Sequence, residues 1–490
     1  MAVASRPSRR RFIGSGVAAA VALALGLPER ARSSTPNTPA DRASLEGFPS
    51  LDGAFLLDDA SRDKFSFDTG RNIQHVPLAV LKPGSIDDVV RAVKHANRHR
   101  LRIAMRGQGH STWGQSLVEG GLVIDSGSLR AVTLAGSEHV DVQAGATWSE
   151  VNQVTLAAAR TPPVMPNTMI TVTVGGILSA GGIGETSHRF GAIVDAVDEL
   201  EVVTGEGRLV TCSPRRESEL FNMVLAGMGQ CAMIMRARLR LERAPDNVIR
   251  QNLVYHDFDT FFADARRVAL DGRFDYQELM AARTPAGGRW TFTIRAGKAY
   301  SGTQVPRLDG PTSGMAHDEA TKPISVSYWD YLLRESARNA VDMTDGTKNP
   351  RRRAALAMFL PISSAKEFVA EILASSQHTA GLNAIFLLPV NVRRCTRPLL
   401  KLPDENAAFS VWLSRRTAAD APEYTNGLMS YRAILERMRA MGGKHYSPYS
   451  TFLSPADWKE HYGPDTWQRL SAAKRTLDPG NILTPGPNMF

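Results

Sequence analysis

The sequence predicts an α+β protein with two domains, and three observations support this prediction. A short strand at residues 77–83, a helix at 85–97 and a strand ending at 105 precede a glycine-rich turn at 106–115. After Pro245 the pattern changes to longer helices and strands with fewer glycines, which favours a second domain. The length of 490 residues is sufficient for two or three large hydrophobic cores.

The first predicted helix has clear start signals. Ser85 can cap it, and Asp87 and Asp88 suit the positive end of its dipole. Its apolar stripe consists of Ile86, Val89, Val90 and Val93.

The remaining elements follow from local pattern. Prolines in residues 161–168 exclude a helix there, so this segment is predicted to be extended. The other predictions are a strand at 140–143, a helix at 148–158, a hairpin at 200–212, a helix that runs into a glycine turn within 217–230, a strand at 233–241 and helices at 258–270 and 365–375.

Two glycine-rich stretches predict ligand contact. Gly107, Gly109 and Gly114 let the backbone turn sharply, and successive free N–H groups form a concavity suited to a diphosphate. We expect Arg106 to add positive charge to this pocket, in which His110 and Ser111 also stand. A lone histidine in such a turn is more often a hydrogen-bonding residue than a reactive one. The second stretch has five glycines, which suit a flat ligand: Gly175, Gly176, Gly181, Gly182 and Gly184.

The N-terminus is similar to a twin-arginine export signal. Residues 8–13 are basic, and residues 14–27 are apolar but too short to span a bilayer comfortably. A short buried helix is the alternative, but it does not explain the adjacent arginines. Removing residues 1–32 lowers the formal charge from +9 to about +4. The sequence has no basic face with interleaved aromatic residues, so nucleic-acid binding is not expected.

The order of several motifs resembles the vanillyl-alcohol oxidase superfamily, whose FAD-binding domain is of the PCMH type. Residues 106–115, 120–125, 140–148 and 173–179 carry this resemblance. Within the superfamily, the chain is most similar to the cytokinin dehydrogenase family over residues 70–490. The matching segments are 109–111 with Gln115, 173–176, 201–205, 210–213, 220–221, 227–230, 236–238, 328–333, 388–391, 444–446, 457–463 and 489–490.

This resemblance implies a two-part FAD-binding domain and a second α+β substrate domain that covers the flavin. The expected boundaries are a signal peptide at 1–32, a linker at 33–69, the FAD-binding domain at 70–245, the substrate domain at 246–463 and a return to the FAD-binding domain at 464–490. The implied partners are a small-molecule substrate and an electron acceptor, dioxygen or another. We expect a periplasmic or secreted protein without stable membrane insertion after signal removal.

The family also implies individual site residues. His110 corresponds to the histidine that can carry FAD covalently, Tyr446 to a residue facing the active site and Glu278 to a glutamate at the pocket mouth. The residues expected to contact FAD are Met105, Gly107, Gln108, Gly109, His110, Ser111, Gln115, Thr173, Ser179, Ile183, Met233, Tyr446 and Thr484.

Departures from the family pattern are as informative as the matches. The family's catalytic aspartate is replaced by Thr168, which cannot act as a base, and Thr484 and Pro487 replace a serine and a glutamine. No cysteine lies between Met1 and Val210, which excludes the second covalent flavin link of other branches. Cys212, Cys231 and Cys395 lack metal-ligand spacing, so we expect no metal site and core packing as their default role.

The expected function is hydride removal from a C–H bond beside nitrogen or oxygen, with Thr168, Glu278 and Tyr446 at the catalytic site. An alcohol or carbohydrate oxidase is the alternative, in which Glu185, Glu278 or His188 accepts the hydroxyl proton. A flavin-binding protein without catalytic activity is the second alternative, because the aspartate is missing.

The export prediction can be tested with lysine substitutions. Replacing Arg9, Arg10 and Arg11 with lysine should retain the precursor inside the cell, because lysine lacks the planar guanidinium that the twin-arginine receptor reads. Cell fractionation followed by immunoblotting measures the retained fraction. Normal export of the lysine variant would instead indicate a general secretory signal.

Overall fold

The computed structural model describes residues 43–167, 171–283, 288–334, 351–418, 422–451 and 453–490. The predicted signal peptide, residues 33–42 of the predicted linker and Thr168 lie outside these residues. Within them, no helix is both long enough and apolar enough to cross a membrane.

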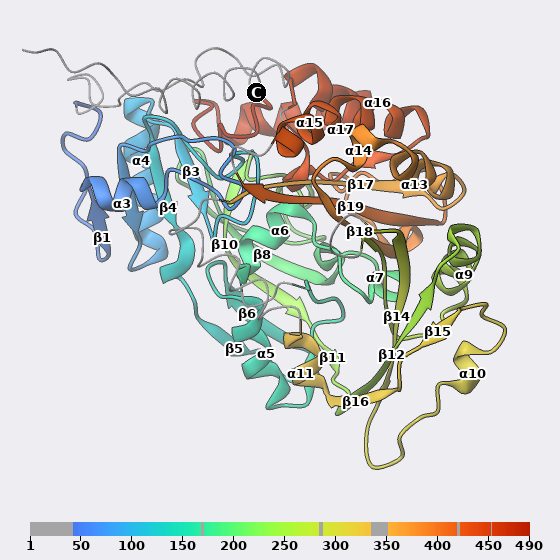
Figure 1. Ribbon diagram of the computed structural model, residues 1–490. Coiled ribbons are helices and arrows are strands. Elements are labelled where there is room, and N and C mark those ends of the chain that lie inside the picture. The colour runs from blue at the N-terminus through green and yellow to red at the C-terminus, as the bar shows by residue number, and fades with distance from the viewer. Residues whose placement is uncertain (1–42, 168–170, 284–287, 335–350, 419–421, 452) are drawn as a thin grey trace, which may run out of the picture.

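The first sheet has four strands in the order β1-β2-β4-β3 (Figure 1). These are β1 (Ala54–Leu56), β2 (Ala79–Lys82), β4 (Leu122–Asp125) and β3 (Ile103–Arg106), of which the last three run parallel. The intervening helix α4 (Ile86–His99) confirms the predicted helix, and the Ser85 hydroxyl accepts a hydrogen bond from Asp88 N at 3.2 Å. The turn that follows β3 therefore starts at an edge of this sheet.

The second sheet is antiparallel and has the order β5-β6-β10-β8-β9. Its strands are β5 (Val132–Leu134), β6 (His139–Gln143), β10 (Ala232–Arg240), β8 (Val197–Thr204) and β9 (Leu209–Cys212). The predicted hairpin at 200–212 is confirmed by the antiparallel pairing of β8 and β9. Helices α5 (Trp148–Leu156), α6 (Val174–Ala180), α7 (Ser187–Phe190) and α8 (Ser218–Val224) accompany it.

The third sheet has nine strands, with β16 beside β12 and the order β15-β12-β14-β13-β18-β19-β17-β20. The strands are β12 (Asn247–Tyr255), β13 (Tyr276–Arg283), β14 (Trp290–Tyr300), β15 (Glu319–Ala320), β16 (Ile324–Ser327), β17 (Arg351–Pro361), β18 (Leu382–Asn391), β19 (Ala407–Ala418) and β20 (Lys444–His445). Its helices are α9 (Phe258–Asp271), α10 (Asp309–Thr312), α11 (Tyr328–Leu333), α13 (Ala365–Ala374), α14 (Ser376–Thr379), α15 (Pro422–Met429), α16 (Tyr431–Ala440) and α17 (Pro455–Leu477). This mixed architecture confirms the predicted α+β class.

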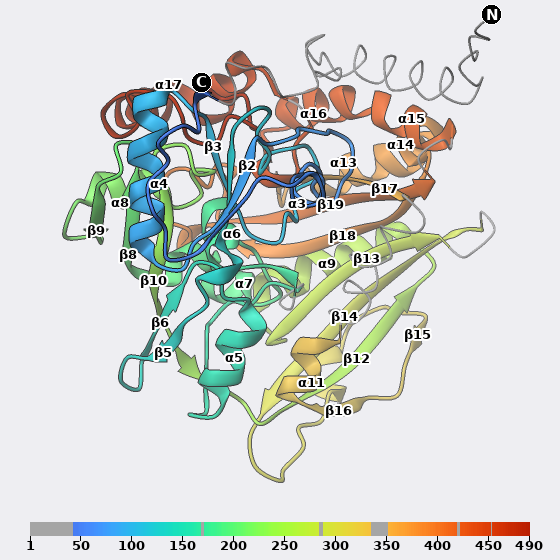
Figure 2. The ribbon, with the colours of Figure 1, turned by 90° about the vertical axis from the view of Figure 1, so that its left-hand side faces the viewer.

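Helices α6 and α7 lie where the second and third sheets meet. Helix α6 contacts β6 and β10, whereas α7 contacts β18. Figure 2 shows the two helices between the strands of the second sheet and the large sheet. The segment from α6 to α7 is therefore in contact with both halves of the molecule.

The helix predicted to start at 217 and run into a glycine turn is confirmed. Helix α8 ends at Val224, and Ala226, Met228 and Gly229 form the turn with positive φ values that no α-helix accommodates. The prediction for the other glycine-rich segment is wrong. The glycine stretch 175–184 is not a uniformly bare strip of backbone, since its first part is helix α6, capped by Thr173. In its second part, a Cβ on Gly184 would lie 2.1 Å from Met165 O, so this glycine permits packing against protein.

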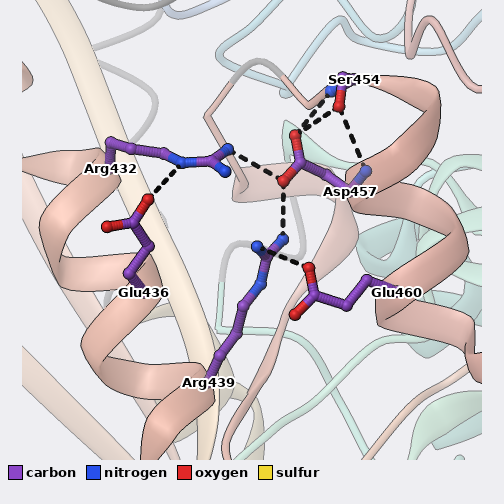
Figure 3. A network of polar contacts seen from close by, with 6 residues as sticks. All are labelled: Arg432, Glu436, Arg439, Ser454, Asp457 and Glu460. Atoms are coloured by element: carbon purple, nitrogen blue, oxygen red, sulfur yellow. Dashed lines mark hydrogen bonds and ion pairs between the residues drawn. The ribbon is translucent and has the colours of Figure 1, made fainter.

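An ion-pair network joins α16 to α17, the two helices that flank residues 444–449 in the sequence (Figure 3). Ser454 is the N-cap of α17, and the Asp457 carboxylate accepts from its hydroxyl at 2.7 Å and binds Arg432 at 2.9 Å and Arg439 at 3.1 Å. Burial opposes ionisation of Asp457, but the Ser454 hydrogen bonds and the arginine charges outweigh it and lower its pKa to about 2. The carboxylate therefore stays charged at physiological pH.

The C-terminal segment returns to the first sheet. Ile103 N donates to Ile482 O, and Thr484 N donates to Ile103 O, each at 2.7 Å. A buried ion pair holds this return, with Lys474 Nζ 2.7 Å from Asp478 Oδ2. Lys474 Nζ also donates to the carbonyls of Gln230 and Leu483, and Asp478 accepts from the backbone of Ile482 and Leu483.

We expect Lys474→Met to lower the free energy of unfolding by about 3–5 kcal/mol, because it leaves the buried Asp478 carboxylate without its counter-charge. Urea denaturation of the FAD-loaded protein measures this change. Lys459→Met is the matched control, since Lys459 is exposed on the same helix. Equal losses in the two variants would contradict a role for the ion pair.

Candidate active site

One cavity gathers residues from the first two sheets, from helix α6, from the segment that follows β20 and from the C-terminal return. It is lined by every residue that the sequence predicted to contact the cofactor except Ile183, which is buried elsewhere in the core. Gly175 and Gly176, which the sequence predicted to lie against a flat ligand, line it too. Tyr449, Ser116, Met228 and Gly229 line it as well, although the sequence did not assign them to a ligand. Segments distant in the chain thus meet at one place.

Backbone forms much of this cavity because glycines replace side chains at its walls. A Cβ on Gly107 would lie 2.3 Å from Thr173 Oγ1, and a Cβ on Gly175 would lie 2.7 Å from Ala144 Cβ. Gly109 has a φ of 64°, in the left-handed region that favours glycine. The turn, the start of α6 and strand β6 can therefore approach one another only with glycine at these positions.

The structure corrects the role predicted for Arg106. Its guanidinium donates to Phe67 O at 2.6 Å and to Phe65 O at 3.3 Å, and Arg106 does not line the cavity. A Cβ on Gly109 would lie 2.3 Å from Arg106 Nη2, so the guanidinium packs directly against the turn. Arg106 supports the turn from the side opposite the cavity and adds no contact to a bound diphosphate.

Asp68 organises the same turn and was missed by the sequence analysis. Its carboxylate accepts hydrogen bonds from Gly114 N at 2.7 Å, Gly70 N at 3.0 Å and the Ser111 hydroxyl at 3.1 Å. Burial raises the pKa of Asp68 to about 6, although these hydrogen bonds and the charge of Arg106 oppose the shift. The predicted ligand residue Ser111 is therefore also a structural anchor.

His110 lines the cavity as a neutral imidazole. Its Nδ1 lies 2.8 Å from the hydroxyl of Tyr449, and its Nε2 is buried without a hydrogen-bond partner among the described residues. Burial and the charge of Arg353 lower the pKa of His110 to about 3. A neutral ring with an unoccupied nitrogen is the form in which histidine can act as a nucleophile.

Tyr446 also lines the cavity. Its hydroxyl accepts a hydrogen bond from Gly182 N at 2.9 Å, and its ring packs edge-on against Phe359 and Trp412. Burial raises its pKa above the usual range, so the phenol stays protonated. Because the hydroxyl accepts from Gly182, its own proton can be donated to a ligand.

Comparison with known proteins shows the family to which this chain belongs. Residues 77–213 match an FAD binding domain, and residues 314–490 match the model described as "Cytokinin dehydrogenase 1, FAD and cytokinin binding". Cytokinin dehydrogenase 4 of Oryza sativa subsp. japonica is 31% identical over 490 residues, which cover 90% of each chain. The chain belongs to the cytokinin dehydrogenase family.

Another family relative is the uncharacterized oxidoreductase ORF5 in the fasciation locus of Rhodococcoides fascians. It is 32% identical over 443 residues, covering 90% of this chain and 99% of the relative. Two solved structures share the fold. Xylooligosaccharide oxidase from Myceliophthora thermophila C1 has a TM-score of 0.73 at 17% identity, and it covers 90% of this chain and 97% of its own. The 6-hydroxy-D-nicotine oxidase from Arthrobacter nicotinovorans has a TM-score of 0.69 at 19% identity, and the match covers 89% of this chain and 97% of the oxidase.

The cavity fits the family's cofactor, FAD. Glycines at its walls leave room for a ligand at the backbone of residues 107–109 and 175–176, and the nitrogen of His110 has no partner within the described residues. Thr173, Ser179 and Gln115 add polar groups, while Met105, Met233 and Ile177 add apolar ones. This family member is therefore an FAD-linked oxidoreductase.

Thr168, at the position of the family's aspartate, lies outside the described residues. Its neighbour Asn167 is described. The Asn167 amide donates to Glu278 at 3.1 Å, and Glu278 forms an ion pair with Arg295 at 2.7 Å. Glu278 itself is buried and does not line the cavity of His110. It contacts Asn167, one residue before Thr168 in the sequence, and its predicted place at the pocket mouth stays a prediction.

The other two alternative bases, Glu185 and His188, also have partners within the protein. Arg334 and the Tyr331 hydroxyl both bind the Glu185 carboxylate. The two ring nitrogens of His188 lie 3.0 Å from Glu185 O and 3.1 Å from Phe274 O, and burial lowers its pKa. Neither residue lines the cavity, so the structure gives both a hydrogen-bonding role and does not support either as a base.

Cysteines and metal ligands add nothing to this site. Cys212, Cys231 and Cys395 are free thiols in the described structure, and the first two are buried in the core. Within the described ranges, no three His, Cys, Asp or Glu residues are grouped so that they could hold a metal ion.

Proposed function

We propose that this oxidoreductase removes hydride from a C–H bond next to nitrogen or oxygen in a small organic substrate. When bound, FAD supplies the hydride acceptor. The observation that carries the proposal is the meeting of the glycine turn, Thr173 and Tyr446 at one cavity. Tyr446 would donate a hydrogen bond to the bound molecule, because Gly182 occupies its acceptor position and leaves its proton available.

Anaerobic flavin reduction tests this function without assuming an electron acceptor. A panel of secondary amines, alcohols and sugars is mixed with the FAD-loaded protein, and bleaching of the visible flavin band is followed. Bleaching by amines supports chemistry beside nitrogen, and bleaching by alcohols or sugars supports the oxidase alternative. If no member of a broad panel reduces the flavin, a protein without catalytic activity is the better explanation.

We further propose that FAD is attached covalently through His110 and that the protein is exported. The neutral imidazole and its unpartnered Nε2 support the first proposal, because only an unprotonated nitrogen can form the bond. Export is supported by residues 1–32 of the sequence alone.

Covalent attachment predicts that acid-precipitated protein keeps its yellow colour. His110→Ala should release the flavin into the supernatant, because it removes the attachment atom while the hydrogen bonds of Asp68 still hold the turn. Flavin fluorescence of the denatured band and the intact mass of the protein give the covalent fraction. His188→Ala is the control, since His188 lies outside the cavity. Complete release of flavin from the unmodified protein would disprove the attachment.

Because Thr168 replaces the family's aspartate, we expect this protein to act on a different substrate from that of the family. Threonine offers a neutral hydroxyl, and loss of one general base lowers a rate roughly 10²-fold to 10⁴-fold. We expect negligible turnover of isoprenoid cytokinins by the unmodified protein and a measurable gain in Thr168→Asp, with the rate of anaerobic flavin reduction as the measurement.

Thr168→Val is the matched control for that substitution because it removes the hydroxyl at similar volume. Rapid oxidation of cytokinins by the unmodified protein, unchanged in Thr168→Val, would show that Thr168 only lines the pocket.

A further inference from the structure

A second cavity of about 230 Å³ lies on the third sheet, beside helix α11. Three arginines line it, namely Arg250 on β12, Arg295 on β14 and Arg334 at the end of α11, together with Asn252 and Tyr331. The labels β12, β14 and α11 in Figure 2 show that these elements lie side by side. Three guanidiniums around one cavity are unusual, since like charges repel.

Strand register explains why the arginines meet. Asn252, Arg295 and Glu278 are Cα partners across β12, β14 and β13, and Arg250 is aligned with Gly297 and Tyr276 two residues further along. Side chains two residues apart share one face of a sheet, so Arg250 and Arg295 project to the same side. Gly297 has no side chain, and this leaves space between Arg250 and Tyr276.

Among the residues that the structure describes, carboxylates balance two of the three charges. Glu278 pairs with Arg295 at 2.7 Å, and Glu185 pairs with Arg334, which also stacks on the Tyr331 ring 3.8 Å from its centroid. Arg250 has no ion pair with a described residue, and its buried Nε has no hydrogen-bond partner there. Since a buried donor without a partner is costly, the cavity has both excess positive charge and unused hydrogen-bonding capacity.

We propose that this cavity is an anion-binding site for a carboxylate or phosphate group, with Arg250 as its principal ligand. Guanidinium groups bind both anions through paired N–H donors, and the Asn252 amide can contribute another donor. The ion pairs with Glu278 and Glu185 fix the other two guanidiniums around the bound group. A carboxylate or phosphate would supply the negative charge that the described residues lack.

The position of the site links it to the active site. Glu278, which holds Arg295, also accepts the hydrogen bond from Asn167. Asn167 precedes Thr168 in the segment that leads to Thr173 in the flavin cavity. The anion can therefore belong to the substrate or be a separate small molecule, and the experiment distinguishes these sources.

Binding is measured by isothermal titration of the FAD-loaded protein with inorganic phosphate and, separately, with malonate. At least one should bind saturably, and Arg250→Gln should weaken binding about tenfold or more, because a charge-assisted contact is lost. Arg250→Lys keeps the charge but not the paired donors, so its affinity should lie between those of the unmodified protein and Arg250→Gln. Arg266→Gln is the matched control, since it removes the same charge from the exposed surface of α9 in the same region.

Absence of saturable binding for both anions would overturn the proposal, as would equal weakening in Arg250→Gln and Arg266→Gln. These titrations need no turnover, so they do not depend on the reaction proposed above. A second arm repeats anaerobic flavin reduction with saturating phosphate or malonate. Competition with the reducing substrate assigns the site to the substrate's anionic group, and unchanged reduction assigns it to a separate anion.

Discussion

The close approach of Gly107 to Thr173 is the contact on which the active site depends. Thr173 Oγ1 would lie 2.3 Å from any Cβ at position 107, and the same oxygen caps α6 by accepting from Gly176 N at 3.2 Å. One contact thus joins the turn at the edge of the first sheet to the helix that packs on the second. A side chain at 107 would separate the two walls of the cavity and displace the helix cap.

The other walls come from segments far away in the sequence. Thr484 belongs to a C-terminal return held by the buried Lys474–Asp478 pair, and Tyr446 lies in the segment that connects α16 to α17, the helices joined through Asp457. The flavin cavity is complete only when these segments are in place. The Lys474–Asp478 pair is remote from the ligand, and loss of one partner of such a buried pair costs several kcal/mol.

Local patterns predicted most of the elements, and tertiary contacts decided what was missed. Helix α4 was predicted because its cap and apolar stripe lie within fourteen residues, and the family motifs placed the cavity lining. The role of Arg106 was wrong because the direction of its side chain depends on carbonyls some forty residues earlier. Asp68 and Tyr449 were missed for the same reason, since their partners lie in other parts of the chain.

The ion pairs of Glu278 and Glu185 restrict how the missing aspartate could be replaced. Glu278 and Glu185 are the acidic candidates from the sequence, and each is engaged by an arginine. If either accepted a proton, its arginine would lose a buried counter-charge, at a cost of about 3–5 kcal/mol. Protonation of either carboxylate is therefore unfavourable, which argues against both as the base. We infer that the preferred substrate gives up hydride without needing a strong protein base, and that polar groups at the pocket mouth serve binding more than proton transfer.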